Sequence, residues 1–156
     1  GIGPKFIKNS KNFLMMEYIN GEKIIDWAKK SETKSKEIRS VISNVLNECF
    51  LLDNARLDHG ELSTIDKHVI VNKKRNTIID FESSSVNRKP SNVTGATQAI
   101  FIGTGLAKII QKKIKLPTKM KIIELIRRYK KNPTLENFEN LTIGLKLQKT
   151  TKKEKN

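Results

Sequence analysis

The chain has 156 residues, of which 37% are hydrophobic and 30% are charged, and this length is enough to form one hydrophobic core. Lysine and arginine outnumber aspartate and glutamate by 31 to 16, and the resulting net charge of +15 includes +10 within residues 111–156. The single cysteine excludes an internal disulfide, and the longest apolar run, residues 99–110, is too short to span a bilayer. Because no signal-peptide pattern opens the chain, we expect a cytoplasmic protein.

The first half of the chain predicts one short strand and two helices. Residues 13–16 are apolar and predict the strand, and residues 22–30 predict a short helix after a turn. A longer helix follows residues 31–35, because its apolar residues recur at steps of three and four. These residues are Ile38, Val41, Ile42, Val45, Leu46, Cys49 and Leu52. Cys49 belongs to this stripe, so we expect it to be buried in the core and to have no catalytic role.

The second half predicts a hairpin and then three helices. The strands of the hairpin are residues 69–71 and 77–79, joined by a polar turn. After Pro90, either of the next two residues can cap a helix that runs to about residue 113. A further helix begins at Pro117-Thr118 and ends near residue 132, and Thr134 caps the last one. The expected fold is therefore α+β and mainly α-helical, with one β-hairpin.

Two acidic motifs lie on either side of the predicted hairpin. The segment Asp58-His59-Gly60-Glu61-Leu62 precedes its first strand, and Asp80-Phe81-Glu82 follows its second strand. Phosphoryl transfer uses one carboxylate to orient the nucleophile and accept its proton, and another to hold Mg²⁺ on the phosphates. A tight loop, a hairpin and a strand that ends in an acidic residue provide both groups. The ordered pair therefore predicts a phosphoryl-transfer site, with Asp58 as an exposed loop charge.

These motifs resemble those of RIO-type and related small archaeal Ser/Thr protein kinases. The run His59 to Ser63 is similar to their catalytic loop, which lacks the arginine of the common form, and Asp80-Phe81-Glu82 is similar to their metal motif. Residues 13–22 resemble a fifth strand and hinge, and residues 88–94 resemble the run that follows the metal motif. The resemblance covers roughly residues 1–110. It implies the large lobe of an ATP-dependent kinase, with a catalytic-loop β-hairpin and with protein substrates that carry a Ser or Thr hydroxyl.

The resemblance also implies roles for individual residues. Glu61 occupies the position of the catalytic aspartate, and its alternative role is a loop carboxylate that caps neighbouring amides, as in a pseudokinase. His59 would brace the backbone near the metal motif. Asp80 would bind Mg²⁺. The second ligand is Asp66 if the count starts from the loop histidine, or His68 if the strand is aligned, and we prefer Asp66 because Mg²⁺ favours carboxylate oxygen over imidazole.

Binding of ATP is expected at the hinge. Met16, Glu17 and Ile19 match the positions around the adenine, where backbone groups make the contacts, and Glu22 could reach a ribose hydroxyl. The alternative is an edge strand followed by the first turn of a helix, where a glutamate is favourable in any case. ATP and Mg²⁺ are thus the cofactors that the resemblance implies.

Kinases also need a Gly-rich loop and a strand lysine, but Gly1 and Gly3 lie in no such pattern. We therefore expect residues 1–20 to be the last small-lobe strand and the hinge, residues 21–146 the large lobe, and residues 147–156 a basic disordered tail. An isolated chain of this kind is expected to be inactive.

Two other functions stay open at this stage. The alternative to an enzyme is a non-catalytic kinase-like module that binds RNA or a ribonucleoprotein partner through its basic C-terminus. The same charge can simply be a solvated surface. A small-molecule kinase would share the loop chemistry but would be expected to have a larger acidic substrate pocket.

Overall fold

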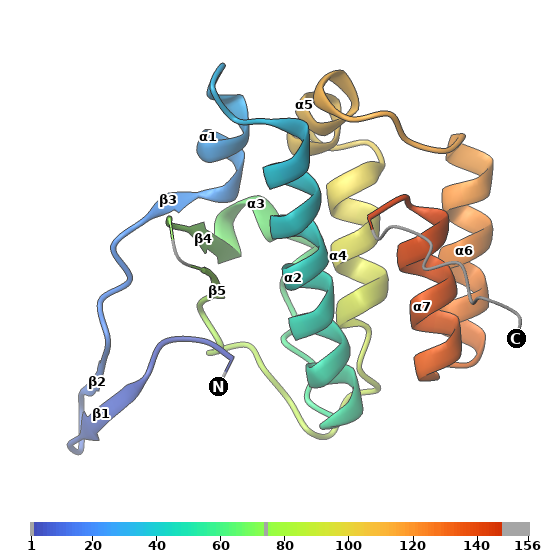
Figure 1. Cartoon of the computed structure of the whole chain (residues 1–156). Coiled ribbons are helices and arrows are strands. Elements are labelled where there is room, and N and C mark those ends of the chain that lie inside the picture. Colours follow the sequence, from blue (N-terminus) through green and yellow to red (C-terminus); the bar gives the residue numbers. More distant parts are fainter. Residues whose placement is uncertain (1, 74, 148–156) are drawn as a thin grey trace, which may run out of the picture.

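The structure is a computed structural model that describes residues 2–73 and 75–147. Helices dominate it, and the strands form two small sheets (Figure 1), which confirms the expectation of an α+β, mainly α-helical fold. The elements are β1 Phe6–Asn9, β2 Leu14–Met16, β3 Glu22–Lys23, α1 Ile24–Lys29, α2 Ser35–Asn54, a 3₁₀ turn Leu62–Thr64, α3 Ile65–His68, β4 Val69–Val71, β5 Asn76–Ile78, α4 Asn92–Phe101, α5 Gly105–Lys113, α6 Lys119–Lys131 and α7 Leu135–Gly144.

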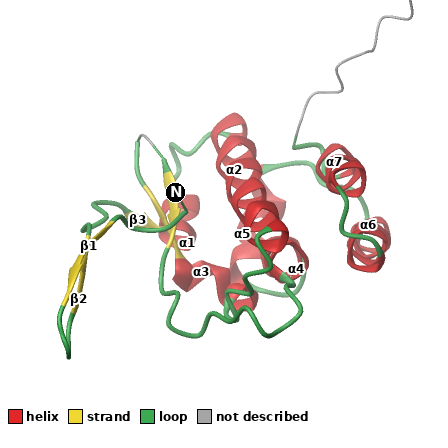
Figure 2. Ribbon diagram, turned by 90° about the horizontal axis from the view of Figure 1, so that it is seen from below, coloured by secondary structure: helices red, strands yellow, loops and turns green. Residues whose placement is uncertain are grey.

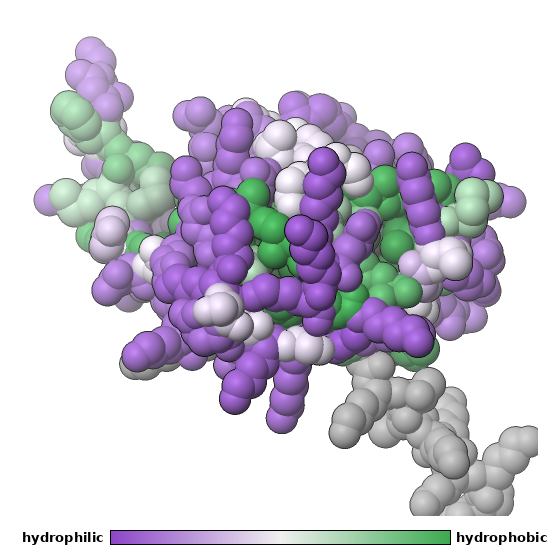
Figure 3. All heavy atoms as spheres, turned by 90° about the horizontal axis from the view of Figure 1, so that it is seen from above, coloured by the Kyte–Doolittle hydropathy of each residue, from purple (hydrophilic) through white to green (hydrophobic). Residues whose placement is uncertain are grey.

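Helix α2 is the centre of the hydrophobic core. Its apolar stripe packs against α4, and α6 and α7 lie side by side on the far side of α4 (Figure 1). Cys49 is completely buried in this stripe, as predicted, and burial raises the pKa of its thiol well above the usual range. On the face seen in Figure 3, long hydrophilic side chains cover most of the surface and hydrophobic atoms show between them. The core therefore has the position that the periodicity predicted.

The helix predicted from residue 92 to about residue 113 is wrong as a single element. It is divided into α4 and α5, which meet at an angle of 67°. Gly103 adopts a positive φ of +77° at the break, and the Thr104 side chain caps α5 by accepting a hydrogen bond from the Ala107 amide at 3.0 Å. Among the described residues no single helix is long and apolar enough to cross a membrane, although this bent pair passes the same test by length and composition.

Strands β3, β4 and β5 form an antiparallel sheet in that order, and β1 and β2 form a separate hairpin that projects from the body (Figure 2). The prediction of a helix from residue 22 is corrected here, because Glu22 and Lys23 pair with Val71 and Ile70 before α1 begins. Gly21 permits this pairing, since a Cβ there would lie 2.6 Å from the Val71 carbonyl oxygen. β4 is confirmed, and β5 begins one residue before the predicted strand.

The C-terminal helices begin at the predicted positions, and a threonine side chain caps each of them. The side chains of Thr118 and Thr134 accept hydrogen bonds from the amides of Lys121 and Asn137, both at 3.3 Å. Helix α7 ends at Gly144. The predicted tail at residues 147–156 lies outside the described residues from residue 148 onward.

Candidate active site

The loop that precedes the hairpin is held in place by Asp58. This side chain is buried, and it accepts hydrogen bonds from Arg88 Nε at 2.9 Å and from the Ser91 amide at 3.2 Å. Its backbone pairs with Ser85 in an isolated bridge. The expectation of an exposed loop charge is therefore wrong, because the segment after Asp80 folds back and supplies Asp58 with donors that the sequence pattern does not reveal.

His59 braces the loop against the end of β5. Its amide donates to Asn92 Oδ1 at 2.9 Å, and its ring nitrogen Nε2 lies 3.0 Å from the Ile79 carbonyl oxygen. The ring is fully buried and stacks obliquely against Phe81, with ring centroids 4.7 Å apart. Burial lowers the pKa of the imidazole, so the neutral form is favoured, and Nε2 carries its proton because it faces a carbonyl. These contacts hold the loop against the end of β5.

Glu61 lies between the segment after Asp80 and α3. Its Oε1 accepts a hydrogen bond from the Ser83 hydroxyl at 2.8 Å, and its Oε2 is 3.3 Å from His68 Nε2. The side chain is 37% exposed, so it is also accessible from solvent. An ionised carboxylate has about four lone-pair sites, and these two contacts leave sites for a further donor.

Asp80 lies two residues after the end of β5. Its backbone has a φ of +70°, an uncommon conformation that aspartate tolerates better than most residues and that often occurs at functional sites. Its Oδ2 lies 3.7 Å from His68 Nδ1, and its side chain is 44% exposed. The strained backbone thus presents an accessible carboxylate next to a buried imidazole.

His68 is the residue that brings the two carboxylates together. One ligand atom from each of Glu61, His68 and Asp80 lies within 4.8 Å of the others, which makes these three side chains a candidate metal site. Asp66, the preferred second ligand, does not join this group. Two residues on a helix point about 200° apart, so the single turn of α3 that directs His68 to the carboxylates directs Asp66 away from them.

The two glutamates among the predicted nucleotide-binding residues form ion pairs with other side chains. Glu17 Oε2 is 3.0 Å from Arg75 Nη2, and Glu22 forms an ion pair with Lys30 at 2.6 Å. Both carboxylates are therefore paired with cations and not directed at the Glu61–His68–Asp80 group. Met16 is exposed at the end of β2, and Ile19 is half-buried in the connection to β3.

A buried polar network that the sequence did not reveal anchors the site to the helical core. Asn92, at the start of α4, donates from Nδ2 to Asp53 Oδ1 and to the Leu57 carbonyl, each at 2.8 Å. Tyr129 donates to Asp53 Oδ2 at 2.9 Å. Desolvation raises the pKa of Asp53 despite these hydrogen bonds. The sequence signal for this network was an acidic residue, Asp53, directly after the apolar stripe of α2. Its partners Asn92 and Tyr129 are 39 and 76 residues away along the chain, so the sequence pattern did not identify them.

The comparison with known families decides the class of this fold. The sequence-family model of the RIO domain matches residues 2–94. These residues include the loop with His59 and Glu61, the β4–β5 hairpin and Asp80. The chain belongs to the RIO domain family. This places it among the RIO-type atypical kinases, as the resemblance indicated, and helices α5 to α7 lie beyond the matched segment. An uncharacterized protein of Methanocaldococcus jannaschii is 27% identical to the chain over 118 residues, which are 74% of this chain and 99% of that protein.

Proposed function

We propose that the chain provides the large lobe of an ATP-dependent phosphotransferase that acts on a Ser or Thr hydroxyl of a protein. The observation that carries the proposal is the convergence of Glu61 and Asp80 on His68, with both carboxylates accessible to solvent. Membership in the RIO domain family supports it. The two carboxylates have the chain positions that an acceptor for the nucleophile's proton and a metal ligand require.

In this proposal, Glu61 accepts a hydrogen bond from the substrate hydroxyl and then its proton. The hydroxyl oxygen forms a bond to the γ-phosphorus of ATP, the bond from that phosphorus to the bridging oxygen breaks, and ADP leaves with the electron pair. Asp80 and His68 would hold a divalent cation, which when bound offsets the charge of the phosphates. The Ser83 hydroxyl keeps the Glu61 side chain in one position, and His59 fixes the loop relative to Asp80 through Ile79.

The test measures nucleotide binding to the 156-residue chain by NMR titration with ATP and a divalent cation. We expect Asp80→Asn to weaken binding at least tenfold, because the amide lacks the charge that holds the cation. Asp66→Asn is the matched control, since Asp66 lies outside the group, and we expect less than a twofold change. An equal effect of the two substitutions, or tight binding to Asp80→Asn, would refute the proposed site.

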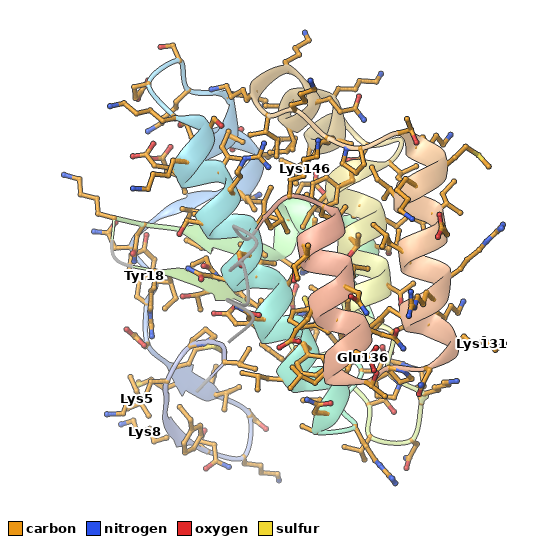
Figure 4. The ribbon with its side chains drawn as sticks, turned by 45° about the vertical axis from the view of Figure 1, so that its right-hand side comes forward. Lys5, Lys8, Tyr18, Lys131, Glu136 and Lys146 are labelled. Carbon is orange, nitrogen blue, oxygen red and sulfur yellow. The ribbon has the colours of Figure 1, made fainter. Side chains whose placement is uncertain are left out.

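A second candidate function is a binding surface for RNA or a ribonucleoprotein, and helix α6 favours it. Its cationic side chains are all exposed, and Lys131 extends away from the body at the end of the helix (Figure 4). They are Lys119, Lys121, Arg127, Arg128, Lys130 and Lys131. Glu124 is the one acidic residue of α6, and it pairs with Lys121 at 3.0 Å. The other cations of the helix are available to a polyanion.

A further inference from the structure

His68 is a buried imidazole whose Nδ1 has no hydrogen-bond partner within the described chain. Its side chain is 8% exposed, so water does not readily replace the missing partner. Native structures leave few buried polar atoms without a partner, and an orphaned atom of this kind is often explained by an ion that completes the site. The nearest candidate for an interaction with Nδ1 is Asp80 Oδ2, at 3.7 Å, which is too long for a hydrogen bond.

The contacts of His68 determine which of its nitrogens can bind a cation. Nε2 lies 3.3 Å from the Glu61 carboxylate, which can only accept when it is ionised. Nε2 is therefore the nitrogen that faces an acceptor, which leaves Nδ1, on the side of Asp80 Oδ2, as the nitrogen that can bind a cation. A cation bound between Nδ1 and Oδ2 would bond to both atoms and would give the buried Nδ1 the partner that it lacks.

The distance between the two donors fits a metal with short bonds. Ligand bonds of about 2.1 Å to a tetrahedral ion separate two donor atoms by about 3.4 Å, close to the 3.7 Å between Nδ1 and Oδ2. A carboxylate that orients a histidine through its other nitrogen is the usual arrangement around a metal-binding imidazole. Glu61 has that position here, which makes it a positioning residue for His68.

We infer that Asp80 and His68, with His68 oriented by Glu61, form a site that prefers Co²⁺ or Zn²⁺ to Mg²⁺. The inference rests on the proposed function, because the metal belongs to the same phosphotransfer site. Mg²⁺ prefers oxygen ligands in an octahedral arrangement, whereas imidazole is a good ligand for the later divalent metals. The mixed donor set is thus unlike the all-oxygen set expected from the sequence, and His68 is the source of the difference.

The experiment titrates the 156-residue chain with each metal alone, without nucleotide. The chain has two histidines, so a ¹⁵N spectrum of the imidazoles contains one set of signals for His68 and one for His59. We expect Zn²⁺ to shift the Nδ1 signal of His68 and to leave that of His59 in place. By calorimetry, Zn²⁺ and Co²⁺ should bind at least tenfold more tightly than Mg²⁺.

Variants identify the ligands and the positioning residue. We expect His68→Asn to reduce Co²⁺ affinity at least tenfold, and Asp80→Asn to do the same at a solvent-accessible position where loss of the fold is not expected. Glu61→Ala should reduce metal affinity about 10- to 100-fold, and Glu61→Gln should restore most of it, because its amide oxygen can still accept the Nε2 proton. Asp66→Asn should leave metal binding unchanged.

Three results would overturn the inference: an unshifted His68 signal, equal affinity for Mg²⁺ and Zn²⁺, or full Co²⁺ binding by Asp80→Asn. These outcomes are separate from a failure of the proposed function. Metal binding without any nucleotide binding would support the site and refute the phosphotransferase. Asp80-dependent nucleotide binding with no preference for Co²⁺ or Zn²⁺ would support the phosphotransferase and refute the metal selectivity.

Discussion

Gly60 and Arg88 are in such close contact that a side chain at Gly60 would displace the arginine. A Cβ at Gly60 would lie 2.6 Å from Arg88 Nη2 and 2.8 Å from the Ser83 carbonyl oxygen. Arg88 bonds both to that carbonyl and to Asp58, so the contact connects the loop before the hairpin to the segment after Asp80. Gly60 thus lets these two parts of the site approach each other.

Substitution of this glycine tests the contact. Gly60→Ala should lower the free energy of unfolding by more than about 2 kcal/mol. The positive φ costs roughly 1–3 kcal/mol for a residue other than glycine, and the clash of the new Cβ adds to this cost. Gly103→Ala is the matched control, because Gly103 also has a positive φ but a Cβ there meets nothing within 4 Å. We expect about 1 kcal/mol for the control. Equal values from urea denaturation of the two variants would contradict the close approach.

The anchor at the start of α4 should be costly to remove. Asn92→Ala deletes the acceptor of the His59 amide and the donors to Asp53 and Leu57, which leaves buried groups unpaired. We expect a loss of about 3 kcal/mol or more, and about 1–2 kcal/mol for Tyr129→Phe, which removes one donor to Asp53. Thermal denaturation measures both. A loss of stability for Asn92→Ala no larger than that for Tyr129→Phe would show that the Asn92 hydrogen bonds contribute little to the free energy of unfolding.

Glu48 should make stability depend on pH. Burial raises the pKa of its carboxyl from 4.5 to about 7, and hydrogen bonding by Asn76 and the charge of Arg75 offset this only in part. Below pH 4.5 the carboxyl is protonated in both the folded and the unfolded chain. As the pH rises toward 7, the unfolded chain ionises first, so stability falls across this window and then levels off.

Glu48→Gln should remove this contribution and keep the hydrogen bond from Asn76. At pH 8 the variant should be more stable than the wild type by on the order of 1 kcal/mol, a value reduced because the side chain is only half-buried. At pH 4 the two should be equal. Urea denaturation at both pH values is the measurement, with Glu139→Gln, at an exposed position of α7, as the control. A variant that is not more stable at pH 8 would contradict the buried carboxyl.

The isolated 156-residue chain should not turn over ATP at a useful rate. Its sequence contains no Gly-X-Gly-X-X-Gly loop to cover the phosphates. The contacts that such a loop makes with the transferred phosphoryl group are therefore missing. ATPase and autophosphorylation assays with Mg²⁺ or Mn²⁺ measure this directly. Turnover that disappears in Asp80→Asn would show that the chain holds a complete catalytic site.

Binding of single-stranded RNA should depend on salt if α6 takes part. Replacement of Lys130 and Lys131 by alanine removes two exposed cations and should lower the slope of log affinity against log salt by about 1.4, at roughly 0.7 per phosphate contact. Alanine at Lys5 and Lys8, which lie on the distant β1–β2 side (Figure 4), is the control. An unchanged slope in the α6 variant would indicate that these charges are a solvated surface with no part in RNA binding. Deletion of residues 149–156 tests the tail in the same way.

The sequence by itself determined the helical core, most of the element order and the two acidic motifs around the hairpin. Local rules are enough for these features, because the stripe of α2 follows a period of 3.6 and the caps at Thr118 and Thr134 bond within three residues. The same rules missed the break at Gly103 and the pairing of Glu22 with Val71. In both places a turn or a distant strand overrides the local helical pattern.

Only the tertiary structure decided which side chains form the site. Asp66 and His68 are two residues apart and were both candidates, and the choice depends on which side of α3 faces Asp80. The burial of Asp58 and the network of Asp53, Asn92 and Tyr129 likewise depend on contacts between distant segments. A sequence fixes which groups are available, but a site depends on direction and distance, and these are set when the hairpin, the loop and α4 pack together.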